Sequence, residues 1–225
     1  MALLLKGNAL FLHIPKTGGS WVTTVLEEMG LVIGKIGVKH ADIAHVMFAD
    51  NSKTILKNRP FMFCFVRHPL SWYESWYKHM SQPSRRWCYW GSECEVEKWH
   101  PNMMLNGLGD DNFNRFVENV AHRRPGYATE MFGWFTTPPV NFVGRQENLR
   151  DDLITALELA KVEFDPEVIR KYPKVRVSPE PNNKIVWDAD LKKQVTQLEY
   201  AGLVRYGYDT AYLQQWQCTA VLAAS

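Results

Sequence analysis

"LFLHIPKTGGSWVTTVLEEMG", residues 10–30, joins an apolar run to an amphipathic pattern through a lysine and two glycines. The run 9–14 predicts a buried strand, and the spacing of apolar residues over 19–29 predicts a helix. Glycines let a backbone approach an anion closely, and the first amides of a helix have no acceptor within it. The stretch therefore favours a loop that holds a phosphate. A plain strand–turn–helix junction with an exposed lysine is the alternative.

The rest of the chain alternates short apolar runs with helical patterns, which is typical of a parallel sheet flanked by helices. Further strands are predicted over 31–38, 61–66 and 140–144, and further helices over 69–80, 147–160 and 188–200. Pro69 suits the first turn of its helix, and Asp188 suits an N-cap. We therefore expect a three-layer, P-loop-like α/β fold with a central parallel sheet, in one domain over residues 1–225.

The alternating pattern breaks between about residues 82 and 112, where tryptophan, glycine, proline and polar residues dominate. We interpret this segment as an insertion or lid. Its aromatic residues and two arginines could contact an acceptor or could form a small core of their own: Trp87, Tyr89, Trp90, Trp99, Arg85 and Arg86.

Composition indicates an ordinary globular protein, with 225 residues, 46% apolar and 22% charged. A net charge of +2 is too small to indicate general binding to nucleic acid. No run is long enough to cross a bilayer, and the apolar start lacks a basic region and is interrupted by Lys6. We expect a cytoplasmic protein. Cys88 and Cys94 could pair, but a disulfide framework is the less favoured interpretation.

The phosphate loop is not a Walker A motif, because its lysine precedes the glycines. A kinase or NTPase would also need an acidic residue after a later strand to hold Mg²⁺, whereas the apolar run 61–66 ends in Arg67. Both features argue against nucleoside triphosphate hydrolysis.

"HIPKTGGSW" (13–21) resembles the 5′-phosphosulfate loop of sulfotransferases that use 3′-phosphoadenosine 5′-phosphosulfate (PAPS), most closely that of the carbohydrate enzymes of the heparan sulfate 6-O type. "FVRHPLSWYESWY" (65–77) resembles the family's 3′-phosphate motif through Arg67, Pro69 and Ser75. Relatives often carry a second arginine where this chain has Trp72. The stretches 141–153, 176–184 and 200–209 are similar to later family segments, so the resemblance extends over most of the chain.

The resemblance implies a set of residues that bind PAPS: Lys16, Thr17, Gly18, Gly19, Ser20, Trp21, Arg67 and Ser75. Lys16 would also stabilise the leaving phosphate. Trp21 would lie near the adenine, with a core position in the first helix as the alternative. No metal is required by this chemistry, and no metal-ligand spacing stands out.

For the base that takes the acceptor's proton we predict His40, which follows the second predicted strand, where open α/β folds place their sites. A pKa near ~6.5 suits a base at neutral pH. "KHAD" (39–42) also resembles the catalytic-histidine segment of the 6-O-type relatives. His45 is the second choice, with a position packed against the core as its alternative.

Together these features predict a sulfotransferase that moves a sulfonate from PAPS to a hydroxyl, on a carbohydrate by the closest resemblance. A small alcohol, phenol, lipid or tyrosine acceptor stays open. More distant alternatives are a P-loop kinase or NTPase and a silent nucleotide-binding protein. The expected partner is a small-molecule or glycan acceptor, without nucleic acid or a membrane span.

Overall fold

The computed structural model describes residues 2–49, 56–82, 100–173 and 185–209. Within these residues the strands form one five-stranded sheet in the order β3-β1-β2-β4-β5. The strands are β1 Ala2–Leu5, β2 Ala9–Leu12, β3 Val32–Ile36, β4 Phe61–Val66 and β5 Phe142–Arg145. The sheet and the surrounding helices confirm the α/β class.

The expectation of a wholly parallel sheet is wrong for one strand. β2, β4 and β5 are parallel, but β1 runs antiparallel to both β2 and β3. β1 and β2 form a hairpin whose turn contains Gly7 and Asn8 with φ of 72° and 59°. Glycine and asparagine tolerate this left-handed backbone. The apolar start of the chain is therefore an additional strand, which the sequence analysis did not recognise.

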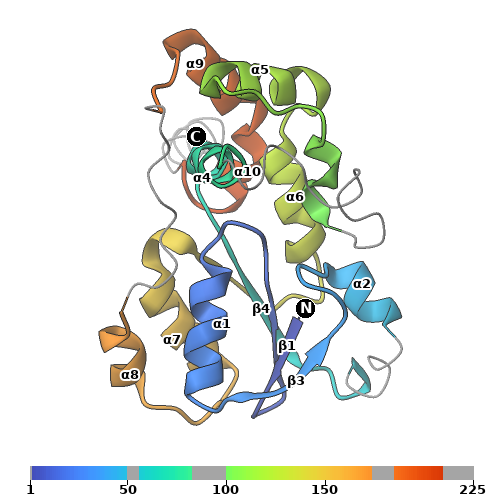
Figure 1. Ribbon diagram of the computed structural model, residues 1–225. Coiled ribbons are helices and arrows are strands. Elements are labelled where there is room, and N and C mark those ends of the chain that lie inside the picture. Colours follow the sequence, from blue (N-terminus) through green and yellow to red (C-terminus); the bar gives the residue numbers. More distant parts are fainter. Residues whose placement is uncertain (1, 50–55, 83–99, 174–184, 210–225) are drawn as a thin grey trace, which may run out of the picture.

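Helices cover both faces of the sheet. Along each strand, alternate side chains enter one of two cores. Phe11, Phe63 and Phe65 point into the first core, and Leu12 and Cys64 point into the second. Figure 1 shows the helices of the first core beside the sheet, α1 Gly19–Glu28, α7 Leu149–Leu159 and α8 Pro166–Lys171. The second core includes residues of α2 Ile43–Phe48 and α6 Tyr127–Thr136.

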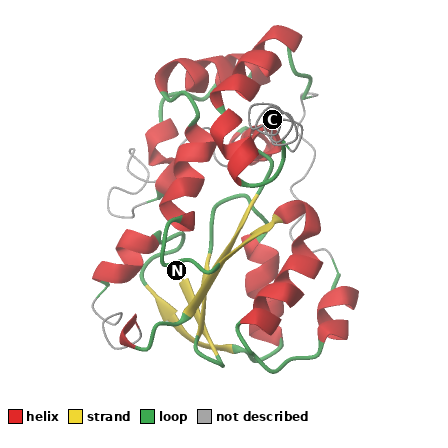
Figure 2. Ribbon diagram, turned by 180° about the vertical axis from the view of Figure 1, so that it is seen from behind, coloured by secondary structure: helices red, strands yellow, loops and turns green. Residues whose placement is uncertain are grey.

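The remaining helices form a bundle beyond the carboxyl end of β4 (Figures 1 and 2). They are α4 Pro69–Met80, α5 Phe113–Arg123, α9 Ala189–Leu198 and α10 Tyr200–Arg205. The buried carboxylate of Glu199, between α9 and α10, accepts hydrogen bonds from the Tyr73 hydroxyl at 2.7 Å and from the backbone amides of Ala128 and Thr129 at 3.0 and 2.8 Å. Glu199 therefore joins α4, the amino end of α6 and the last described helices.

Several local predictions are confirmed. Pro69 lies in the first turn of α4, and the Asp188 carboxylate accepts from the amide of Leu191 at 2.9 Å as the N-cap of α9. The predicted helix 188–200 is in fact two helices that meet at Glu199. The helices over 113–136 were not predicted.

The insertion predicted at 82–112 is described only in part. Its aromatic and arginine residues at 85–99 lie outside the described residues, as do Cys88 and Cys94. The following 3₁₀ helix, Pro101–Leu105, is capped by His100 and buries Asn102 and Leu105. This last part of the segment is packed into the protein. The single-domain boundaries and the lid role stay predictions.

Candidate active site

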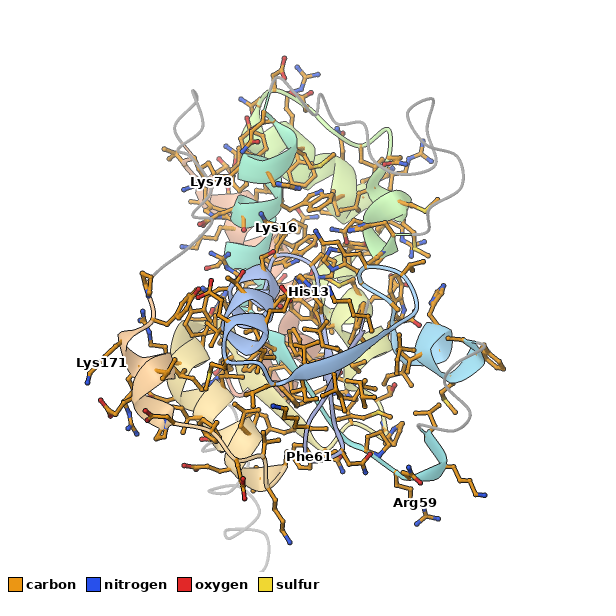
Figure 3. The ribbon with its side chains drawn as sticks, turned by 60° about the horizontal axis from the view of Figure 1, so that its bottom comes forward. His13, Lys16, Arg59, Phe61, Lys78 and Lys171 are labelled. Carbon is orange, nitrogen blue, oxygen red and sulfur yellow. The ribbon has the colours of Figure 1, made fainter. Side chains whose placement is uncertain are left out.

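The loop between β2 and α1 has the backbone that an anion-binding loop needs. Lys16 and Gly18 adopt left-handed conformations, with φ of 65° and 84°, and Gly18 is the N-cap of α1 without any side-chain cap. The Thr17 hydroxyl donates to the Ile14 carbonyl at 3.0 Å and so closes the loop on itself. Because a helix leaves its first amides without intrahelical acceptors, the amides at the start of α1 are suited to an anion. Figure 3 labels Lys16 at this junction.

The two glycines of the loop are required by close packing. A β-carbon on Gly18 would lie 2.6 Å from Leu149 Cδ2, and one on Gly19 would lie 2.1 Å from Cδ2 of His13. Both distances are shorter than any real carbon–carbon contact, so the loop can approach α7 and His13 only without side chains. Ser20 follows in the first turn of α1 and is half-buried.

Arg67 follows β4 at the same edge of the sheet, because β2 and β4 are parallel neighbours with Leu12 opposite Cys64. Its Nε is buried and has no hydrogen-bond partner among the described residues. Burial lowers the pKa of Arg67, opposed by the nearby carboxylates of Glu147 and Glu74. A guanidinium keeps its charge in proteins, so Arg67 is a cation with a donor available.

The backbone beside Arg67 is fixed by the segment that follows β5. Glu147 accepts from the His68 amide at 2.9 Å and from the Tyr208 hydroxyl at 2.7 Å. The His68 and Tyr208 rings are also in contact, with centroids 5.1 Å apart. Ser75 lies further along α4 and is half-buried, on the same side as Ser71. Arg67 therefore lies at a strand–helix junction whose backbone is held by hydrogen bonds, and Ser75 lies on the helix that follows it.

The two predicted phosphate segments are directly connected through Trp72. Its indole N–H donates to the carbonyl oxygen of Pro15, the first residue of the phosphate loop, at 3.1 Å. The sequence analysis noted Trp72 only as a replacement for an arginine. This hydrogen bond spans 57 positions of the chain and gives no signal in a single sequence.

His40 is buried beyond β3 in a left-handed conformation, with φ of 62°. The Nδ1–H of His40 donates to the His13 carbonyl at 2.8 Å, because a carbonyl can only accept. Nε2 is therefore the unprotonated nitrogen of the neutral ring. Burial, together with the charges of Lys39 and Lys16, lowers the pKa of His40 to about 3, although the bond to the His13 carbonyl raises it. The ordinary pKa that supported this histidine in the sequence analysis is therefore wrong.

His40 belongs to a cluster of three buried imidazoles. Its ring centroid lies 4.5 Å from that of His13 and 4.8 Å from that of His100. Burial also lowers the pKa of His13 and of His100. Nδ1 of His100 accepts from the Asn102 amide at 3.0 Å. Sequence reasoning placed His13 in the first predicted strand and did not connect His100, which lies in the irregular segment, with the site.

His45, the second choice for the base, lies on α2. Its Nδ1 is 2.8 Å from an Asp42 carboxylate oxygen, which also accepts the His45 amide at 2.9 Å. The His45 side chain is partly exposed, so it is not packed into the core, which was the alternative to a role as the base. Asp42 is the N-cap of α2.

Trp21 is only 7% exposed. Its indole N–H donates to the Pro173 carbonyl at 2.9 Å, and the Arg150 guanidinium lies over its ring, 5.6 Å from the centroid. Arg150 in turn donates to the Tyr172 carbonyl at 2.6 Å. Trp21 therefore holds residues 172–173 against α1. Its burial resembles the core position that the sequence offered as the alternative to a position near the adenine.

Within the described part of the chain, no group of three or more histidine, cysteine, aspartate or glutamate side chains is arranged to hold a metal ion. In the same residues, none of the helices is both long enough and apolar enough to cross a bilayer.

Comparison with known proteins identifies the family. The sequence profile described as the sulfotransferase family matches residues 6–209, so the chain belongs to the sulfotransferase family. The match includes the phosphate loop, His40 and the Arg67 segment. No curated protein and no solved structure matches the chain. The family assigns to the chain a transferase activity, the transfer of a sulfonate group.

Proposed function

We propose that the chain is a PAPS-dependent sulfotransferase in which the loop 15–20 binds the 5′-phosphosulfate and Arg67 binds the 3′-phosphate. The observation that best supports this is the buried Nε of Arg67, which has no acceptor among the described residues. A buried donor without a partner is unfavourable, and an anion at this position would satisfy it. The uncapped start of α1 offers a second anion site at the neighbouring strand end.

The residues present fit the donor. The left-handed backbone at Gly18 turns the loop into the start of α1, where amides would face an anion, and Lys16 adds a positive charge. The planar fork of Arg67 suits a phosphate, and Ser75 adds a hydroxyl on the same junction. The two proposed anion sites follow parallel neighbouring strands, so one ligand with two phosphates could contact both. Gly18, Ser20 and Thr17 would contribute backbone amides, since the Thr17 hydroxyl is already engaged.

The reaction forms a bond between the acceptor oxygen and sulfur and breaks the bond between sulfur and the bridging phosphate oxygen. Lys16 would stabilise the negative charge that develops on the leaving phosphate. His40 would accept the acceptor's proton at Nε2, because Nδ1–H is held by the His13 carbonyl. A pKa of about 3 keeps the ring neutral before an anion arrives, and a nearby phosphosulfate would raise that pKa.

For the acceptor we propose a carbohydrate hydroxyl. Support comes from the likeness of the loop 13–21 and of the segment 39–42 to the carbohydrate enzymes. A small alcohol, a phenol, a lipid or a tyrosine is the alternative acceptor, and the acceptor panel described below would identify it.

The donor is tested by differential scanning fluorimetry with 3′,5′-ADP, without metal, against ATP–Mg²⁺. We expect 3′,5′-ADP to raise the melting temperature of the wild type, and Arg67→Ala to remove most of that shift. His122→Ala is the matched control, because His122 is exposed on α5. Stabilisation by ATP–Mg²⁺ instead would support the kinase or NTPase alternative and refute the proposal.

Transfer itself is tested with ³⁵S-labelled PAPS and a panel of glycan, alcohol, phenol, lipid and tyrosine acceptors. We expect His40→Ala to lose transfer while it still binds 3′,5′-ADP. Near-normal turnover by that variant would exclude His40 as the base and make His45 the next candidate. Nucleotide binding without transfer to any acceptor would favour a silent binding protein.

A further inference from the structure

We propose that Trp72 is a positioning residue that sets the distance between the two anion sites of the donor. This inference rests on the proposed function. Its basis is the indole hydrogen bond from Trp72 to the Pro15 carbonyl, 3.1 Å long and buried. Pro15 precedes Lys16 directly, and Trp72 lies one turn after the junction that contains Arg67.

A short chain of bonds links the two sites. The backbone amide of Trp72 donates to the His68 carbonyl at 2.9 Å, and His68 follows Arg67 directly. The His68 amide is held by Glu147 at 2.9 Å. From this fixed point the indole extends to Pro15, so that the start of the loop is tied to the start of α4.

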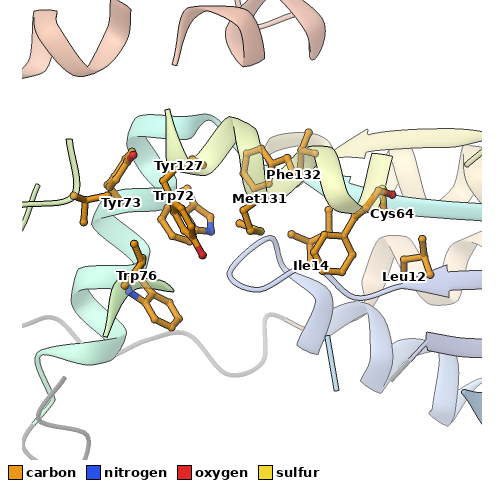
Figure 4. Packing of buried hydrophobic residues seen from close by; sticks show 14 of the residues in the cluster. Leu12, Ile14, Cys64, Trp72, Tyr73, Trp76, Tyr127, Met131 and Phe132 are labelled. Carbon is orange, nitrogen blue, oxygen red and sulfur yellow. The ribbon is translucent and has the colours of Figure 1, made fainter. Parts of the chain in front are cut away.

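The surroundings of Trp72 give the indole one orientation. The side chain is fully buried. Its ring is parallel to that of Trp76, with 5.9 Å between centroids, and meets the Tyr73 ring edge-on at 5.4 Å. The Tyr127 ring is tilted against it at 5.8 Å. Figure 4 shows Trp72 among these rings, with Ile14, which lies two residues after β2. Tightly packed aromatic rings do not turn freely, so the N–H is held toward the loop.

Loss of the Trp72 hydrogen bond should weaken the binding of ligands that occupy both anion sites. A ligand with two phosphates gains affinity over its single-phosphate parts only if both sites are held at the right separation. Loss of the indole N–H would free the Pro15 carbonyl and let the loop move relative to Arg67. Binding of 3′,5′-ADP would weaken, whereas ligands that occupy one site would be little affected.

The experiment is isothermal titration of wild type and Trp72→Phe with three ligands: 3′,5′-ADP, adenosine 3′-phosphate and adenosine 5′-phosphate. Trp72→Phe keeps an aromatic ring and removes the N–H. We expect 3′,5′-ADP to bind about tenfold more weakly, equivalent to ~1.4 kcal/mol. We expect each monophosphate to change by less than about twofold. Trp134→Phe on α6 is the control, since it removes a half-buried indole without a bond to the loop, and it should leave all three affinities unchanged.

A second substitution protects the test against a variant that fails to fold. Benzothienylalanine at position 72 keeps the two-ring shape and replaces the N–H with sulfur, and urea unfolding would verify that it is folded. Unchanged affinity for 3′,5′-ADP in a folded variant would overturn the inference, as would an equal loss for all three ligands. If the wild type does not bind 3′,5′-ADP, the proposed function itself fails. If the wild type binds and a folded variant gives either of these two results, the Trp72 inference alone fails.

Discussion

The buried imidazole cluster should make the folded protein less stable at acidic pH. His13, His40 and His100 have lowered pKa values in the folded protein, chiefly because they are buried. In the unfolded chain each titrates near ~6.5. Between the folded-state and unfolded-state pKa values, the unfolded chain binds more protons than the folded protein. The stability of the folded protein therefore falls as the pH decreases below the pKa of the free imidazole. The positive charges of Lys39 and Lys16 near His40 act in the same direction.

The magnitude follows from the linkage relation. For each imidazole that stays neutral in the folded state, the protein loses about 2 kcal/mol of stability between pH 7 and pH 5. Three such groups give ~6 kcal/mol, a large part of the 5–15 kcal/mol typical of a domain. We therefore expect steep acid destabilisation over this interval.

The assay is urea unfolding followed by circular dichroism at half-unit steps between pH 5 and pH 7. His100→Asn should reduce the loss by about one third, ~2 kcal/mol, because asparagine can still cap the 3₁₀ helix but does not titrate. His122→Asn, at an exposed position on α5, is the control and should leave the loss unchanged. A wild-type loss below ~2 kcal/mol, or an unchanged loss in His100→Asn, would refute the reasoning.

Three further predictions concern the loop, the helical bundle and the base. Gly19→Ala places a methyl carbon 2.1 Å from the His13 ring, so we expect ~1–3 kcal/mol lower stability in urea and weaker binding of 3′,5′-ADP; stability within ~0.5 kcal/mol of wild type would contradict the packing. Glu199→Gln replaces an acceptor of several buried hydrogen bonds with a group that also carries donors, and should cost ~2–4 kcal/mol in the same assay; a neutral effect would show that the carboxylate is dispensable. At pH values where circular dichroism shows a folded protein, the pH profile of kcat/KM for PAPS should lack an acid limb near ~6.5, because the pKa of His40 is about 3 before the donor binds; a limb at that pH would contradict a buried neutral base.

The sequence predicted the local features that depend on neighbours in the chain. The strand at β4, the Pro69 helix start and the Asp188 cap depend on residues within a few positions, and all are observed. β1 was missed because a run of four apolar residues is too short to be recognised as a strand from its periodicity.

The long-range part of the site could not be predicted in this way. His100 lies 60 positions from His40, and only folding brings their rings to 4.8 Å. The lowered pKa of His40 is caused chiefly by burial of its side chain. This burial is not evident from the sequence, which therefore suggested the ordinary pKa. The Trp72 bond to Pro15 likewise depends on how α4 packs against the loop. Spacing identifies candidate residues, whereas their electrostatics depend on the packed structure.

The central claim is that one bisphosphorylated adenosine lies across the Lys16 loop and Arg67. The most direct measurement is a crystal structure with 3′,5′-ADP. We predict that the 5′-phosphate contacts Lys16 and the amides at the start of α1, and that the 3′-phosphate lies within hydrogen-bond distance of the Arg67 guanidinium. Bound nucleotide with either side chain turned away from it would contradict the account.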